Sequence, residues 1–123
     1  MKKIILILSI LLSGTTIQAQ NIEANKLAVK LKKQPLLIDV RTTEEYNEGT
    51  ILGAMNLNLN SSDSFLKLTE HIEKDREIIL FCQSGVRSNE AYEQLKSDGF
   101  KNVSQLEGGY ERWLEQEEEN SSK

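Results

Sequence analysis

The sequence predicts an α/β fold: a central, mostly parallel sheet flanked by helices on both faces. Strand-like and helix-like segments alternate along the chain at short spacing, which is the order expected of parallel strands joined by helical crossovers. Two strand-like runs, 36–41 and 78–81, are predominantly apolar and lack the alternation of a half-exposed strand. Strands of this kind are buried between two layers of helices.

The first 20 residues indicate a secretory signal peptide. Lys2 and Lys3 precede an apolar run at 4–12, and small and polar residues lead to a cleavage zone near Ala19. The apolar run is shorter than the roughly 20 residues that a membrane-spanning helix needs. We therefore expect an exported protein, periplasmic or secreted, without a stable membrane anchor once the leader is removed.

Removal of residues 1–20 leaves 103 residues with 13 basic and 19 acidic side chains, a net charge of −6. This length suits one domain, which we place at 21–114. An acidic surface of this kind does not attract nucleic acid. Residues 115–123 are acidic and polar and predict a disordered tail, and we expect the mature chain to be a monomer.

Apolar periodicity predicts the elements of the first half of the domain. Residues 21–33 carry apolar side chains at helical spacing and predict an amphipathic helix, which Pro35 ends before the buried strand. Residues 42–49 combine a capping hydroxyl, early glutamates and a final glycine, as a short helix does. The second half of 51–59 alternates apolar and polar residues, which predicts a half-exposed strand.

The second half of the domain continues the alternation. Phe65, Leu68 and Ile72 mark a helix, and residues 88–95 predict another that Asp98 and Gly99 close. A short strand is expected within 100–106. Tyr110, Trp113 and Leu114 then lie on one side of a final segment, where core packing is their expected role.

Cys82, the only cysteine, stands where a buried strand ends and a helix begins. The first N–H groups of a helix lack intrahelical partners and stabilise an anion. Gly85 allows the loop to curl around Cys82, and Arg87 adds a positive charge, so we expect a thiolate nucleophile. The simpler alternative is a small buried side chain without chemistry. The predicted anion-binding loop consists of Gln83, Ser84, Gly85, Val86, Arg87 and Ser88.

Two charged residues are candidates to support this loop. Asp39 and Arg41 come at the end of the other buried strand. Sites in parallel sheets form at the carboxyl ends of the strands, so we expect both side chains at the same rim as Cys82.

Five segments together resemble the single-domain rhodanese-like sulfurtransferases. They are L-L-I-D-V-R at 36–41, E-E-Y-N-E-G at 44–49, I-L-G-A-M-N-L at 51–57, I-I-L-F-C-Q-S-G-V-R-S at 78–88 and L-E-G-G-Y-E-R-W at 106–113. The resemblance covers essentially the whole expected domain and implies a small α/β fold in which Cys82 carries a persulfide.

By this resemblance, the Cys82 thiolate takes a sulfur from a donor such as thiosulfate and passes it to cyanide or a thiol in a second step. The amides of residues 83–88 would hold the anionic persulfide, and an external thiol protein is a further possible acceptor. No metal and no organic cofactor is implied. Two departures from the family pattern stand out: Thr50 replaces a common histidine, and Arg87 is the only basic residue of the loop. Arg87 either faces the substrate or fixes the loop by pairing with Asp39, Glu44 or Glu45.

Three alternatives remain open at this point. The domain could be a binding or regulatory module whose thiol is idle. It could be a cysteine phosphatase or arsenate-type enzyme, but those enzymes place arginine six positions after the cysteine, whereas Arg87 comes five after Cys82. It could also be a thiol carrier, although no second cysteine is present to resolve a mixed disulfide.

Overall fold

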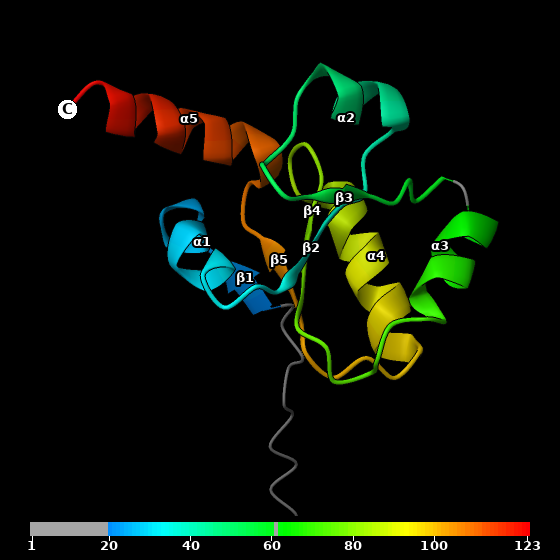
Figure 1. Cartoon of the computed structure of the whole chain (residues 1–123). Helices are drawn as coiled ribbons and strands as arrows, with labels where there is room; N and C mark the ends of the chain where they lie inside the picture. Colours follow the sequence, from blue (N-terminus) through cyan, green and yellow to red (C-terminus); the bar gives the residue numbers. More distant parts are fainter. Residues whose placement is uncertain (1–19, 61) are drawn as a thin grey trace, which may run out of the picture.

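One five-stranded sheet organises the chain in the computed structural model, which describes residues 20–60 and 62–123 (Figure 1). The strands lie in the order β1-β5-β4-β2-β3, and all neighbouring pairs are parallel. Their bounds are β1 Gln20–Ile22, β2 Leu36–Asp39, β3 Met55–Asn56, β4 Ile78–Phe81 and β5 Val103–Leu106. The predicted α/β fold with a parallel sheet is confirmed.

Helices cover both faces of this sheet, as expected. Their bounds are α1 Ala24–Leu31, α2 Thr43–Glu48, α3 Ser62–Thr69, α4 Val86–Ser97 and α5 Gly109–Ser121. Helices α1 and α5 lie on one face and α3 and α4 on the other, while α2 lies beyond the carboxyl ends of the strands (Figure 1).

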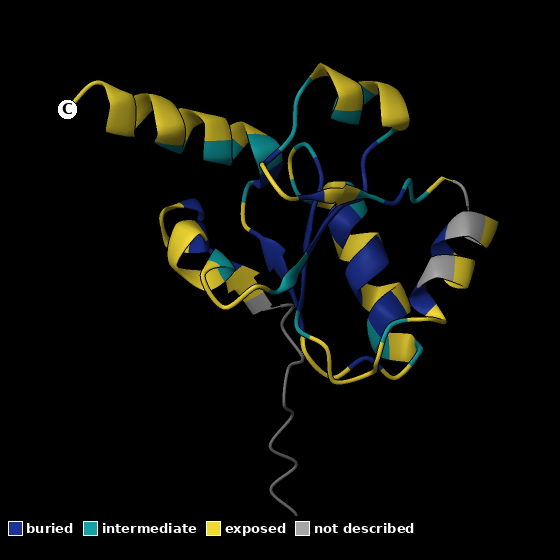
Figure 2. Cartoon of the chain, in the orientation of Figure 1, coloured by how far each residue is buried: buried dark blue, intermediate teal, exposed yellow. Residues whose placement is uncertain are grey.

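The central strand β4 separates two apolar clusters. Its four residues are all 0% exposed, and the strand is coloured as buried in Figure 2. Their side chains alternate between the two faces. Ile78 and Leu80 join the cluster under α3 and α4, whereas Ile79 and Phe81 join the cluster under α1 and α5. The continuous apolar run at 78–81 is therefore explained by burial on two sides.

The register of β2 against β4 brings the predicted rim residues Asp39 and Arg41 to the same edge of the sheet as Cys82. Leu36 pairs with Ile78 and Asp39 with Phe81, so the two strands end level. The chain turns out of β2 at Asp39 and out of β4 immediately before Cys82. Parallel pairing thus sets the rim of the sheet on which the candidate site is built.

Two local predictions need correction. Residues 20–22 form strand β1 beside β5, whereas the sequence pattern indicated a helix from residue 21; that helix begins only at Ala24. Only Met55 and Asn56 of the segment 51–59 form a strand. The segment opens instead with a turn in which the Ala54 N–H bonds to the Ile51 carbonyl and Gly53 has a positive φ of 90°.

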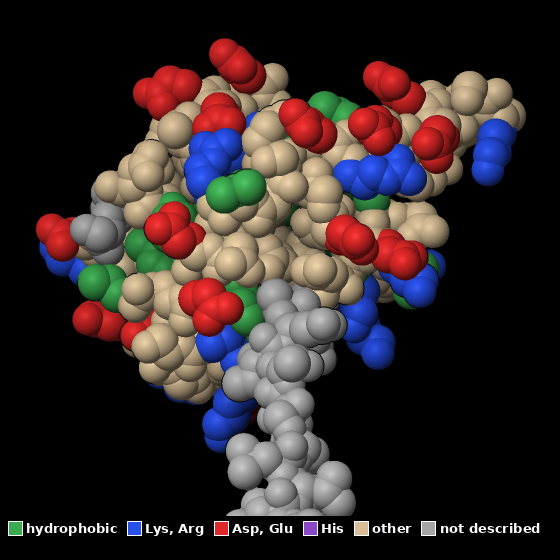
Figure 3. All heavy atoms as spheres, turned by 180° about the vertical axis from the view of Figure 1, so that it is seen from behind, with side chains coloured by type: hydrophobic (Ala, Val, Ile, Leu, Met, Phe, Trp, Pro, Cys, Tyr) green, Lys and Arg blue, Asp and Glu red, His purple; other side chains and the backbone are tan. Residues whose placement is uncertain are grey.

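The expected disordered tail at 115–123 is also wrong for most of its length, because α5 continues to Ser121. Glutamate and glutamine are good helix formers, and Arg112 forms ion pairs with Glu115 and Glu119 along one side of the helix. The predicted solvent exposure does hold: α5 runs away from the sheet, and acidic side chains gather along it (Figures 2 and 3).

Residues 1–19 of the predicted leader lie outside the described residues, and Gln20 is the first residue of β1. Within 20–60 and 62–123, no helix combines the length and the apolar character that crossing a membrane requires.

Replacement of Leu80 by alanine should lower the free energy of unfolding by about 2–5 kcal/mol, because it leaves a cavity in a strand buried on both faces. Urea denaturation measures the loss. Leu52→Ala removes the same atoms from a side chain that is 93% exposed and should change stability little. Equal losses in the two variants would contradict the placement of β4 at the centre of the core.

Candidate active site

The sulfur of Cys82 lies inside the loop that joins β4 to α4. Cys82 is 1% exposed, and its thiol forms no disulfide. Gly85 caps α4 with φ 112° and ψ −9°, a left-handed conformation that favours glycine. This turn points the Gly85 N–H back at Cys82 Sγ, 3.0 Å away. The loop therefore closes around the sulfur, in the way that the Gly85 position predicted.

Ser88 contributes a hydroxyl to the same sulfur. Its Oγ accepts a hydrogen bond from the protonated Cys82 thiol at 3.6 Å and donates to Gln105 Oε1 at 2.8 Å; once Cys82 is ionised, the same hydroxyl can turn to donate to the thiolate. Gln105 is buried on β5, and its Nε2 donates to Asn89 Oδ1 at 3.2 Å. Gln105 was not among the expected site residues. The signal that could have found it is a polar residue in an otherwise buried strand.

Two opposing effects set the pKa of the Cys82 thiol. Burial is the largest and raises the pKa, because it removes the thiolate from water. Hydrogen bonds from the Ser88 hydroxyl and from the backbone N–H groups of Ser88, Gly85 and Ser84 together outweigh burial. The pKa of Cys82 consequently lies below its ordinary value, which favours a nucleophilic thiolate near neutral pH.

Arg41 joins the end of β2 to the Cys82 loop. Its Nε and Nη2 donate to the Asp39 carboxylate, at 2.8 Å for the shortest contact, and both side chains are buried. Nη1 donates to Gln83 Oε1 at 3.1 Å, and Nη2 also donates to the Gly49 carbonyl. The structure thus brings Asp39 and Arg41 to the rim of the Cys82 loop, where they hold its first residue.

Thr50, which replaces the histidine common in the family pattern, supports the same pair. Its hydroxyl donates to Asp39 Oδ2 at 2.9 Å. The Tyr110 ring lies against the Arg41 guanidinium, with the ring centroid 4.3 Å from Cζ, and Trp113 stacks on Tyr110. The expected core role of these aromatics is therefore only part of their function, since Tyr110 also borders the site.

Arg87, which the sequence suggested could pair with Asp39, Glu44 or Glu45, pairs with Glu45. Its Nη1 and Nη2 lie 2.6 and 2.9 Å from the two carboxylate oxygens. The hydrogen bonds from Arg87 are the main cause that lowers the pKa of Glu45 to about 2, so this carboxylate is ionised in any physiological solution. The pair fastens the first turn of α4 to helix α2.

Helix α5 holds the loop from the opposite side. The Tyr110 N–H donates to the Cys82 carbonyl at 2.8 Å, and the Glu111 N–H donates to the Gln83 carbonyl at 3.1 Å. Gly109, with φ 64°, lies so close that a Cβ there would be 2.6 Å from both carbonyl oxygens. The glycine at this position is required by the close approach of two backbones.

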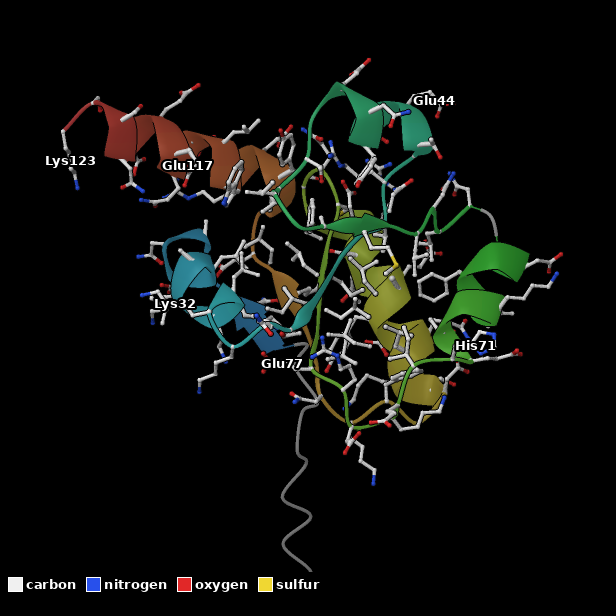
Figure 4. The ribbon with its side chains drawn as sticks, in the orientation of Figure 1. Lys32, Glu44, His71, Glu77, Glu117 and Lys123 are labelled. Atoms are coloured by element: carbon white, nitrogen blue, oxygen red, sulfur yellow. The ribbon has the colours of Figure 1, made fainter. Side chains whose placement is uncertain are left out.

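A hollow of about 410 Å³ lies beside the first residue of the loop, Gln83. Its walls are Arg41, Glu45, Glu48, Gly49, Gln83 and Tyr110. Val86, expected to belong to the anion-binding loop, exposes 78% of its surface to solvent, and its role in binding an anion through its backbone stays a prediction. Within the described ranges, no group of three His, Cys, Asp or Glu side chains is placed to hold a metal ion. His71 lies near the end of α3, away from this rim (Figure 4).

Replacement of Ser88 by alanine should raise the pKa of Cys82, because the thiolate loses the strongest of its side-chain and backbone hydrogen bonds. Alkylation by iodoacetamide, followed as a function of pH, measures the change, and the rate at neutral pH should fall several-fold. Ser84→Ala makes the same substitution in the loop but keeps the backbone N–H, and should leave the profile unchanged. Matching shifts in both variants would rule out the Ser88 hydroxyl as the cause.

Replacement of Gly109 by alanine should displace the Cys82 loop, because the new Cβ overlaps the Cys82 and Gln83 carbonyls. Gly99→Ala is the matched control: φ is 92° there, but nothing lies within 4 Å of a Cβ. Gly99→Ala should lose about 1 kcal/mol of stability through backbone strain alone, and Gly109→Ala should lose more because its Cβ also overlaps two backbone carbonyls. Only Gly109→Ala should also slow alkylation of Cys82, and equal alkylation rates would show that α5 does not position the loop.

Comparison with known proteins places these features in one family. The family model of the rhodanese-like domain matches residues 23–116. The thiosulfate sulfurtransferase GlpE of Coxiella burnetii is 31% identical over 97 residues, which are 78% of this chain and 85% of that protein. A tRNA uridine(34) hydroxylase of Bdellovibrio bacteriovorus is 33% identical over 96 residues, but these span only 27% of the hydroxylase.

Solved structures agree with the sequence comparison. The human single-domain sulfurtransferase TSTD1 has a TM-score of 0.68 and 28% identity, covering 80% of this chain and 97% of that one. A rhodanese-related protein of Thermoplasma volcanium has a TM-score of 0.67 and 29% identity, covering 79% of this chain and 92% of that one. With the family model spanning nearly the whole described sheet, the chain belongs to the rhodanese-like family.

Proposed function

We propose that this protein is a sulfurtransferase that forms a persulfide on Cys82. The observation that carries the proposal is a single buried cysteine enclosed by its own loop, with the Gly85 N–H 3.0 Å from the sulfur and the pKa of the thiol lowered. The names of two relatives, a thiosulfate sulfurtransferase and a single-domain sulfurtransferase, support the same chemistry.

In the first half-reaction, the Cys82 thiolate attacks the outer sulfur of a donor. The sulfur–sulfur bond of the donor breaks, and its electron pair leaves on the remainder: sulfite in the case of thiosulfate. In the second half-reaction, cyanide or a thiolate attacks the outer sulfur of the Cys82 persulfide and regenerates the Cys82 thiolate. Both steps conserve charge without a metal, an oxidant or an organic cofactor.

The chain's own groups hold the anion through both steps. The N–H groups of Ser84, Gly85 and Ser88 and the Ser88 hydroxyl converge on the sulfur, and they can hold the persulfide in the same way. The Arg87 guanidinium is occupied by Glu45 rather than directed into the loop. This arrangement, with a loop one residue shorter than that of the cysteine phosphatases, favours a single sulfur over a phosphoryl group.

A binding module with an idle thiol is the second candidate, and the 1% exposure of Cys82 is the observation that favours it.

We further propose, from the leader expected at 1–20, that the protein acts after export as a monomer in the periplasm or outside the cell. An external thiol, small or on a protein, would then clear the persulfide, because Cys82 is the only cysteine.

Intact-protein mass spectrometry tests the proposal. Incubation with a panel of sulfane donors should add one sulfur atom, about 32 Da, to the wild type but not to Cys82→Ala, and cyanide or a thiol should remove it. Alkylation of Cys82 serves as the control for an accessible thiol. A thiol that alkylates yet takes sulfur from no donor would contradict sulfur transfer and leave the binding module as the better explanation.

A further inference from the structure

The two arginines near the Cys82 loop, Arg41 and Arg87, each form an ion pair with a carboxylate of the protein. Arg41 gives Nε and Nη2 to Asp39 and Gly49, and Nη1 to Gln83, so each of its nitrogen atoms has a partner within the protein. Arg87, the only basic residue of the loop, forms a two-pronged pair with Glu45. A substrate that enters beside the loop therefore meets two guanidinium groups whose charges are each paired with a carboxylate.

The two ion pairs beside the hollow are each neutral, and Glu48 leaves one excess negative charge at its wall. Glu45 and Glu48 contribute carboxylates to its wall, and Arg41 is the one cation among its lining residues. Asp39 lies directly behind Arg41 and offsets that cation. Acidic side chains are also spread over the surface of α2 above the rim (Figure 3). A dianion such as thiosulfate is repelled here, whereas a donor of low net charge is not.

We propose that Glu45, by holding Arg87, makes this site select sulfane-sulfur donors of low net charge over dianionic thiosulfate. The inference rests on the proposed sulfurtransferase function and names the class of donor that this function uses. Glu45 is a specificity-determining residue in this scheme and does not touch the reacting sulfur. The donor class is one in which an outer sulfur is attached to a neutral or singly charged remainder, such as an organic thiosulfonate or persulfide.

Arg87 stands in the first turn of α4, next to the loop that encloses Cys82, so breaking its ion pair with Glu45 would change the charge near the sulfur. The hydrogen bonds to Glu45 are the main cause of the raised pKa of Arg87, and the charge of Cys82 is a further cause. Once Glu45 loses its charge, Arg87 still belongs to the first turn of α4, but its guanidinium is no longer neutralised. It can then attract an anion at the mouth of the loop.

The substitution that tests this role is Glu45→Gln. Glu45 also completes a capping box, in which its N–H bonds to Thr42 Oγ1 while its carboxylate accepts from the Thr42 N–H. Glutamine serves the same position in a capping box, so helix α2 keeps its N-terminal cap. The matched control is Glu44→Gln, which removes the same charge from the neighbouring residue, whose side chain is exposed and points away from the sheet (Figure 4).

Three donors that react in the same way but differ in net charge show whether the charge of the donor decides the rate. Thiosulfate carries two negative charges, methanethiosulfonate carries one, and 2-aminoethanethiosulfonate is a zwitterion of zero net charge. In each case the Cys82 thiolate attacks the outer sulfur, the sulfur–sulfur bond breaks, and the electron pair leaves on sulfite or a sulfinate. With cyanide as the acceptor in a ping-pong scheme, kcat/KM for the donor reports this first step alone.

In the wild type, we expect kcat/KM to rise from thiosulfate to methanethiosulfonate to the zwitterion. Glu45→Gln should raise kcat/KM for thiosulfate by about five- to tenfold while changing the zwitterion little, because one local charge has been released. Glu44→Gln should change the ratio between the donors much less. Addition of Arg87→Gln to the Glu45→Gln variant should abolish the gain with thiosulfate.

The outcomes distinguish failure of this inference from failure of the proposed function. Transfer from all three donors with thiosulfate preferred by the wild type, or equal effects of Glu44→Gln and Glu45→Gln, would overturn the role of Glu45 and leave sulfur transfer intact. Absence of the Cys82 persulfide with every donor in the series would overturn the proposed function itself. A gain with thiosulfate that survives Arg87→Gln would show that the released guanidinium is not its cause.

Discussion

The buried ion pair of Asp39 and Arg41 is the interaction on which the site depends. A charge inside a protein is stabilising only when its partner and its remaining hydrogen bonds are all in place. Arg41 meets this condition by bonding to three separate segments, β2, the turn at Gly49 and the Cys82 loop, and by packing on Tyr110 of α5. No buried side-chain nitrogen or oxygen in the described part of the chain lacks a partner. The pair therefore fixes the relative positions of the elements that enclose Cys82.

The same balance of burial against hydrogen bonding governs the sulfur itself. Cys82 is withdrawn from water, which alone would keep its thiol protonated. A ring of N–H groups and the Ser88 hydroxyl reverse that effect, and they do so without a basic side chain directed at the sulfur. Because all but one of these donors belong to the backbone, the anion is stabilised by the conformation of the loop together with the Ser88 hydroxyl. The Gly85 turn is consequently as important to the chemistry as any side chain.

The sequence was informative wherever a property is local. The alternation of strands and helices, the burial of 78–81, the cap of α2 and the placement of Cys82 before a helix all follow from residues close together in the chain. Non-local features were missed for a physical reason. Strand β1 is three residues long and lies at the edge of the sheet. It is stabilised by pairing with β5, more than 80 positions away, so its own residues carry little sign of a strand. Of three possible partners for Arg87, only the folded structure identifies Glu45, and nothing near Gln105 in sequence indicates that it reaches Ser88.

Because α5 donates hydrogen bonds to the carbonyls of the Cys82 loop, the loop cannot reach its final structure until α5 has been synthesised. Tyr110 and Glu111 belong to the last helix of the chain, yet they fix the backbone of Cys82 and Gln83. A growing chain that has passed β4 and α4 still lacks these two donors, so the setting of its thiol is incomplete. The cysteine gains its final environment only when the carboxyl-terminal helix packs onto the sheet. The environment that favours the nucleophilic thiolate is thus complete only after α5 has been made and has packed against the loop.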